Sequence, residues 1–169
     1  LHREWLRIAY GDLVRKQNPD TVLEQTSYLY EGLLAAAFEV AVSSTAAAND
    51  SSLTDQFAVI ALGDLAANQM CYGDTVKIMM LYDGTRVPTA NSDNSGFADV
   101  LNKVLAKTLA LLTSSTGEPL FKVDVSFPLS NNNSSPAINL NAAVRYLDFS
   151  GRTWQRCALN GARPCVGNA

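Results

Sequence analysis

The side chains best suited to chemistry in this chain are three cysteines and one histidine. Cys71, Cys157 and Cys165 form no C-x-x-C pair, and the single histidine is His2. Zinc sites and disulfide frameworks need clustered or paired ligands, so neither is expected. Cys71 has no histidine or second cysteine beside it in the sequence, and we expect a passive thiol. This use of cysteine favours an intracellular location, in the cytoplasm or in an organelle matrix.

Composition and charge narrow the class of protein. A chain of 169 residues with 47% hydrophobic and 17% charged residues can build one domain with a real core. Its net charge of −3 leaves no excess of Lys and Arg to neutralise phosphates, so a nucleic-acid partner is not expected. No apolar run approaches the ~20 residues of a membrane-spanning helix. Leu1 in place of an initiator Met indicates a fragment or a processed chain.

The elements that must position any site begin with helices. Residues 1–16 have the pattern of a short amphipathic helix. Asn18-Pro19 favours a helix start, because Asn can cap a helix and Pro is tolerated at its first position. Apolar residues then recur at helical spacing over 21–42, and the small and polar residues of 43–52 predict a loop.

The rest of the chain has the pattern of a sheet with helices. Three apolar runs predict strands, at 57–62, 76–82 and 120–127. Two amphipathic runs predict helices, at 97–112 and at 140–159 with a break near Ser150-Gly151, and polar loops are expected at 88–96 and 130–136. We therefore predict a single α/β (α+β) domain over 1–169, with a helical lead-in over 1–45 and a small mixed sheet with helices over 57–169.

Segment 57–84 resembles a known family. It reads FAVIALGDLAANQMCYGDTVKIMMLYDG and is similar to a strand, glycine-turn, strand signature: G-x-L-G-G followed by Y/N-G-S-D-x-D-L-x-x-x-Y. That signature belongs to the nucleotidyltransferase domain of glutamine synthetase adenylyltransferase. The matching residues are Gly63, Leu65, Tyr72, Gly73, Ile78, Leu81 and Tyr82.

Three further blocks resemble the same domain in the same order. They are the opening L-R-I-A-Y at 6–10 with Asp12-Leu13, F-K-V-D-V at 121–125, and W-Q-R-C-A-L at 154–159 with A-R-P at 162–164. Four ordered blocks make the resemblance specific over nearly the whole chain. It implies a nucleotidyltransferase-like fold.

In active members the resemblance implies magnesium-dependent transfer of AMP from ATP to a tyrosine of glutamine synthetase. Two carboxylates at i and i+2 of one strand, and a third on a neighbour, hold the metal ions. Here the paired positions fall on Thr75 and Lys77, and only the third is kept, as Asp124. A shifted register does not help, because Asp74 would need its partner at Val76. A lysine ammonium in a ligand position repels a divalent cation.

Two other parts of the implied site also differ. An Arg-Leu-Arg-Pro block is replaced by Ser126-Phe127-Pro128-Leu129, and a glycine pair by Ala66-Ala67. We interpret the chain as a catalytically inactive adenylyltransferase-like domain, kept as a structural or protein-interaction subunit of a larger assembly. No catalytic residue, metal or cofactor is then expected. Two alternatives stay open: an active adenylyltransferase using magnesium, ATP and the carboxylates Asp74 and Asp124, or a nucleotide-binding regulatory module.

Weak candidates for nucleotide contact are Gly63, Gly73 and Arg163, although Arg163 can equally form a structural ion pair. Residues 75 and 77 should share one face of their strand, with Asp124 on an adjacent strand. We expect the Lys77 ammonium within ~4 Å of the Asp124 carboxylate, as an internal replacement for the metal. The alternative is that Lys77 extends to solvent.

The long N-terminal helix suggests an interaction surface. It has apolar residues on both sides of the line from Leu29 to Leu33, more than one sheet can cover. We therefore expect an exposed apolar patch on this helix that a protein partner covers. Tyr72 and Tyr82 are expected to pack in the core.

Overall fold

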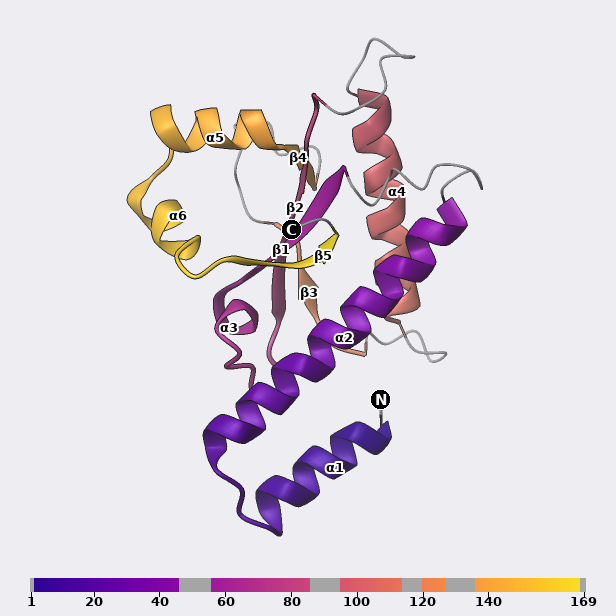
Figure 1. Ribbon diagram of the computed structural model, residues 1–169, viewed down its shortest axis with the longest axis vertical. Helices are drawn as coiled ribbons and strands as arrows, with labels where there is room; N and C mark the ends of the chain where they lie inside the picture. Colours follow the sequence, from indigo (N-terminus) through magenta and orange to yellow (C-terminus); the bar gives the residue numbers. More distant parts are fainter. Residues whose placement is uncertain (1, 46–55, 86–94, 114–119, 127–135, 168–169) are drawn as a thin grey trace.

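The computed structural model describes residues 2–45, 56–85, 95–113, 120–126 and 136–167. Two helices come first and a sheet with further helices follows (Figure 1). The elements are α1 (His2–Leu13), α2 (Pro19–Thr45), β1 (Phe57–Leu62), α3 (Gly63–Ala66), β2 (Val76–Tyr82), α4 (Ser95–Leu111), β3 (Val123–Asp124), β4 (Ala137–Asn139), α5 (Leu140–Phe149), α6 (Thr153–Ala158) and β5 (Arg163–Gly167). This mixed arrangement confirms the predicted α/β class.

Strand β2 is the centre of the five-stranded sheet. β1 runs antiparallel to it along most of its length, from Phe57 opposite Tyr82 to Leu62 opposite Lys77. β5 continues the sheet antiparallel to β1. β3 and β4 both pair parallel with β2, at different heights, so they follow one another along the side of β2 that β1 leaves free. The register of β3 places Asp124 beside Lys77.

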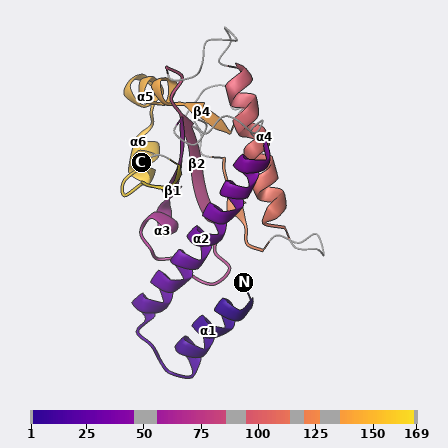
Figure 2. The same ribbon diagram turned by 45° about the vertical axis from the view of Figure 1, so that its right-hand side comes forward.

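One face of the sheet carries the main core. Side chains alternate along a strand, so every second residue of β1 and β2 points to the same face. These residues join side chains of α2 and α4 in one buried cluster that includes Phe57, Val59, Ala61, Val76, Ile78, Met80, Tyr82, Leu34, Phe38, Leu101 and Val104. Figure 2 shows α2 and α4 together on this side of the sheet. Burial of this apolar area is the chief stabilising contribution to the fold.

The opposite face has a smaller cluster. Leu62 and Met79 are buried there together with Ala143 of α5. Partly buried neighbours complete it: Ile60, Leu81, Ile138, Tyr146, Leu147, Leu159 and Ala162. Helices α5 and α6 lie on this side and cover only part of it (Figure 1). The uncovered part is where the candidate site lies.

The predicted start of the long helix is confirmed and its predicted end is wrong. α2 begins at Pro19, and the Asn18 Oδ1 accepts a hydrogen bond from the Asp20 N–H at 3.1 Å. The loop expected from residue 43 starts later, because the helix continues to Thr45. The hydroxyls of Ser43 and Ser44 donate to carbonyls one turn earlier, which lets these polar residues remain helical. Residues 46–52 lie outside the described part.

The predicted strands 57–62 and 76–82 are confirmed with the same bounds, as is the helix break between α5 and α6. The strand expected over 120–127 is wrong in length, since β3 comprises Val123–Asp124 alone. Ser126 bonds back to the Asp124 carboxylate through its N–H and its hydroxyl, which ends the strand. The sequence reading missed α3, β4 and β5. Residues 88–94 and 130–135 of the expected loops lie outside the described residues, and Ser95 and Gly96 open α4.

The apolar patch predicted on α2 is only partly present. Leu29 and Leu33 of α2 are half-buried. Tyr28 and Val40 of α2 are exposed. More of the large exposed apolar side chains lie on α1, on the turn after it and on α5–α6; these are Leu6, Tyr10, Leu13, Val14, Leu140, Val144, Phe149 and Trp154. The short helix α1 covers part of α2, which the sequence pattern did not show. None of the helices in the described ranges combines the length and apolar character needed to cross a bilayer.

Candidate functional site

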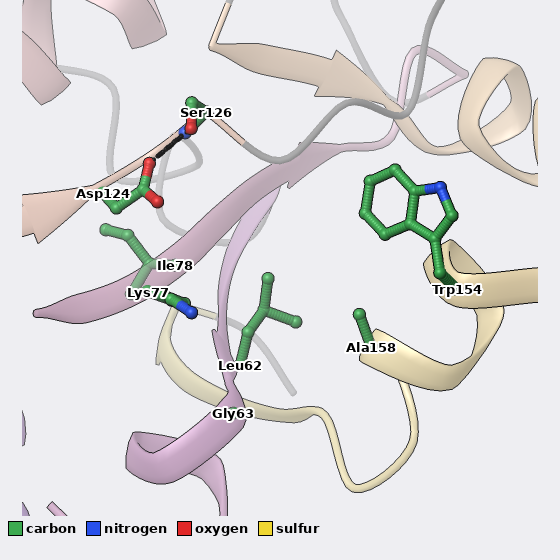
Figure 3. A pocket seen from close by; sticks show the side chains of 8 residues that line it. All are labelled: Leu62, Gly63, Lys77, Ile78, Asp124, Ser126, Trp154 and Ala158. Atoms are coloured by element: carbon green, nitrogen blue, oxygen red, sulfur yellow. Dashed lines mark hydrogen bonds between the residues drawn. The ribbon is translucent and has the colours of Figure 1, made fainter.

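A cavity of about 450 Å³ opens on the less covered face of the sheet. β1, β2, β3 and α6 surround it, and Figure 3 shows the eight side chains that line it. They are Leu62, Gly63, Lys77, Ile78, Asp124, Ser126, Trp154 and Ala158. The lining is mostly apolar, with one cation and one carboxylate on adjacent strands.

Lys77 and Asp124 lie on neighbouring strands, as predicted, but they do not form the predicted ion pair. Among the described residues, ion pairs join Arg7 to Glu4 and Arg163 to Glu31, and none joins Lys77 to Asp124. Lys77 is exposed. Figure 3 accordingly draws the carboxylate bonded to Ser126 and not to Lys77.

Ser126 explains why Asp124 needs no lysine partner. The Ser126 N–H and hydroxyl donate to the Asp124 Oδ1 at 2.9 and 2.5 Å. These two bonds, the hydroxyl's first, hold the pKa of the Asp124 carboxyl below its usual value, and the charge of Lys77 adds a smaller lowering. Local hydrogen bonds from a serine two residues later therefore stabilise the carboxylate.

Asp74, the other carboxylate considered for the metal site, does not line the first cavity. Asp74 accepts a hydrogen bond from the Cys71 N–H at 2.7 Å and lines a second cavity, near Trp5 and Lys122. Thr75 is half-buried directly before β2 and does not line the first cavity. Within the described segments, no three His, Cys, Asp or Glu side chains are grouped to hold a metal ion. The residues present do not fit the magnesium site of the adenylyltransferase resemblance.

The two candidate glycines occupy different places. Gly63 opens α3 at the rim of the first cavity with φ +56°, and Gly73 has φ +79° in the turn before β2. Both need the left-handed conformation that glycine adopts without strain. The Gly73 N–H donates to the Tyr30 hydroxyl at 3.3 Å, so this amide is used within the protein.

The third candidate, Arg163, is a structural residue. Its Nη1 and Nη2 donate to the two carboxylate oxygens of Glu31 at 2.8 and 2.6 Å. Further bonds reach the carbonyls of Leu65 and Ala66 and the Oδ1 of Asn68. The hydrogen bond to Glu31 is the main cause that raises the pKa of Arg163. With its donors engaged by α2 and the turn around α3, the guanidinium is not directed at a phosphate.

An aromatic cluster fixes the turn that leads into β2. Trp5 of α1 contacts Tyr30 and Tyr72 with ring centroids 5.7 and 5.2 Å apart, and Tyr30 contacts Phe121 at 4.8 Å. The Tyr72 hydroxyl donates to Asp12 at 3.2 Å. Tyr72 does not pack in the core as expected: it is exposed (44%) and contacts Trp5 at the surface. Helix α1 thereby anchors residues 71–74.

Tyr82 packs as predicted. It is buried, and its ring meets Phe97 of α4 with centroids 5.5 Å apart. Tyr82 therefore packs α4 against the sheet, whereas Tyr72 joins α1 to the turn before β2, and neither lines the first cavity.

Sequence reasoning missed several functional neighbours. Ser126 stands two residues after Asp124, a spacing typical of side-chain turns, and this spacing could have indicated its bonds to the carboxylate. Trp154 was noted for the resemblance and not as a cavity wall. Glu31 lies 132 positions from Arg163, and nothing local indicates that pairing.

Comparisons with known proteins agree with the sequence resemblance. A family model, glutamate-ammonia ligase adenylyltransferase (GlnE), matches residues 1–169. The bifunctional glutamine synthetase adenylyltransferase/adenylyl-removing enzyme of Brucella suis biovar 1 (strain 1330) is 25% identical over 170 residues, covering 95% of this chain and 17% of that protein. The enzyme of that name from Xanthomonas campestris pv. campestris (strain B100) is 26% identical over 167 residues, covering 96% and 18%. The chain thus spans less than a fifth of these relatives' length.

Proposed function

Because the chain belongs to the glutamate-ammonia ligase adenylyltransferase family, we propose that it is a catalytically inactive member of that family. Its role would be structural or that of a protein-interaction subunit in a larger assembly. The observation that carries this proposal is Lys77 in the cavity beside Asp124, at a position where the family resemblance places a metal-binding aspartate.

The electrostatics of the cavity support the loss of metal binding. Magnesium prefers oxygen ligands and keeps near-octahedral geometry, with carboxylates and substrate phosphates completing the shell. Among the described residues that line the cavity, Asp124 alone has a carboxylate, and one of its oxygens already accepts two hydrogen bonds from Ser126. The Lys77 ammonium adds repulsion against any cation placed nearby.

A stripe on α1 supports the interaction role. Leu6, Tyr10 and Leu13 have spacings that place them on one side of α1, and Val14 follows directly in the next turn. Between 57% and 77% of each of these residues is exposed. The other side of α1 packs Ile8 into the protein. A short helix with apolar residues on both sides is typical of one that a second surface covers.

Titration with magnesium-ATP, followed by assay for AMP transfer, tests the proposal. We expect no binding below millimolar concentrations. Binding without turnover would instead support the nucleotide-binding regulatory module. AMP transfer would support the active adenylyltransferase.

Restoration of the carboxylates sharpens the test. Thr75→Asp combined with Lys77→Asp should strengthen Mn²⁺ or Mg²⁺ binding, because it replaces a cation by ligands of the right charge. Lys103→Asp on α4 makes a similar charge change on an exposed helix outside the cavity lining and should leave metal binding unchanged. Full activity should not return, since Ser126 occupies the start of the lost arginine block.

A further inference from the structure

The cavity has two opposite charges that do not neutralise each other. Lys77 and Asp124 form no ion pair, although their Cα atoms are partners in adjacent strands. In the part of the chain that the structure describes, the Lys77 ammonium has no hydrogen-bond partner, and the Asp124 bonds fall on Oδ1 and leave Oδ2 available. A cation and a carboxylate oxygen therefore face the same space, each able to accept a partner of opposite charge.

The walls of this space are apolar. Leu62 comes from β1, and Trp154 and Ala158 come from α6 (Figure 3). Ile78 reaches the edge of the cavity, but its side chain is buried in the main core on the other face of the sheet. About half of the Trp154 surface is exposed (51%), so part of this apolar side chain remains accessible from the cavity. The volume of about 450 Å³ lies within the ~300–1,000 Å³ typical of small-molecule sites, and a few polar groups on apolar walls are their usual composition.

We propose that this cavity binds a zwitterionic α-amino acid with a large apolar side chain. The ligand's carboxylate would be held by the Lys77 ammonium and its ammonium by the Asp124 Oδ2. Its side chain would pack on Leu62, Trp154 and Ala158. No metal ion and no covalent step are involved.

Charge balance selects a zwitterion over other ligands. A polyphosphate would meet a single ammonium and be repelled by Asp124. A simple acid or a simple amine would contact only one of the two protein charges and would lose one charge-assisted hydrogen bond. An amino acid matches both charges at once and covers the apolar walls.

Calorimetric titration of the 169-residue chain with four probes tests the proposal. L-phenylalanine has both charges and an apolar side chain, 3-phenylpropionate lacks the ammonium, 2-phenylethylamine lacks the carboxylate, and glycine lacks the side chain. We expect L-phenylalanine to bind, and each of the other three to bind at least about tenfold more weakly, because each loses one charge-assisted contact or the apolar contact. Equal binding of phenylalanine and 3-phenylpropionate, or no binding of phenylalanine, would overturn the proposal.

Two variants assign each charge to its residue. In Lys77→Met the advantage of phenylalanine over 2-phenylethylamine should disappear, and in Asp124→Asn its advantage over 3-phenylpropionate should disappear. Lys103→Met on the exposed side of α4 is the control and should preserve both advantages. Unchanged ratios in the first two variants would contradict the assigned contacts.

Calorimetric titration also tests amino-acid binding and the proposed loss of catalysis independently of each other. Magnesium-ATP binding in a parallel titration bears on catalysis, whereas the probe ratios bear only on amino-acid binding. Failure of one therefore does not imply failure of the other.

Discussion

On the face that α2 and α4 cover, alternate residues of β1 and β2 are buried without interruption from Phe57 to Ala61 and from Val76 to Tyr82. On the opposite face the same two strands end at an open cavity beside Lys77. The covered face has the apolar content that the fold needs. The open face has the positions where the family resemblance places catalysis, and those are the positions that differ.

This difference separates what a fold requires from what a reaction requires. A buried face must stay apolar and well packed, or the free energy of unfolding falls. A charged residue at a cavity can change from aspartate to lysine at little cost to stability, because it remains in contact with water. The scaffold can therefore stay stable when residues at the cavity change, as the proposed loss of metal binding requires.

The largest contrast should come from removing one aromatic side chain on each side of the sheet. Phe38→Ala on the covered face should lower the free energy of unfolding by about 3–5 kcal/mol, because Phe38 is fully buried. Trp154→Ala at the cavity should cost less than about 1 kcal/mol, because Trp154 is half exposed. Urea unfolding measures both. Similar losses would mean that the open face is as tightly packed as the covered one.

The cysteines allow a second contrast. Cys165 packs against the main core, and burial raises the pKa of its thiol to about 12. Cys71 and Cys157 are exposed. Since the thiolate is the reactive form, an alkylating reagent at pH 8 should modify Cys71 and Cys157 while Cys165 stays unmodified until the protein unfolds. Mass spectrometry of peptides after labelling in buffer and in urea gives the result; rapid labelling of Cys165 in buffer would contradict its burial.

A half-buried ion pair should contribute more to the free energy of unfolding than an exposed one. Arg163→Met should lower the free energy of unfolding by about 2 kcal/mol, because it removes bonds to Glu31 and to carbonyls around α3 in a half-buried place. Arg7→Met is the matched control, since Arg7 pairs with Glu4 on the exposed side of α1 and should cost less than about 1 kcal/mol. Equal losses would show that the Arg163 pair is energetically a surface pair.

The smallest effect concerns Asp124 itself. Its carboxyl pKa is held low, so its hydrogen bonds stabilise the folded state above the carboxyl pKa of the unfolded chain, and this stability is lost as pH falls through the folded-state pKa. Ser126→Ala should raise this pKa toward its usual value and reduce the loss on acidification. Lys77→Met should raise it less, since the lysine is the smaller cause. A carboxyl titration followed by NMR measures both; a larger shift in Lys77→Met would reverse the assignment.

The sequence predicted those parts of the fold that repeat. The regular spacing of apolar residues predicted α2, β1, β2 and α4, and Asn18 with Pro19 indicated a helix start. The short strands β4 and β5 were missed because three to five residues carry too little pattern, and their pairing depends on β2 and β1.

The site could be predicted in position but not in its contacts. The resemblance brought Lys77 and Asp124 to adjacent strands, which the register confirms. It did not reveal that Ser126 would satisfy the carboxylate and leave Lys77 free to face the cavity. The hydrogen bonds between Ser126 and Asp124 close only a two-residue turn, so they require little loss of chain entropy. An ion pair between exposed side chains of two strands gains little in water.

Transfer of AMP is the most direct measurement of the proposed loss of catalysis. The 169-residue chain, its Asp124→Ala variant and a blank would be incubated with magnesium, ATP labelled in its α-phosphate, and glutamine synthetase. We predict the same background label on glutamine synthetase in all three samples, because Thr75 and Lys77 replace the paired carboxylates. Label that exceeds the blank with the unaltered chain and disappears with Asp124→Ala would contradict the proposal and identify an active enzyme.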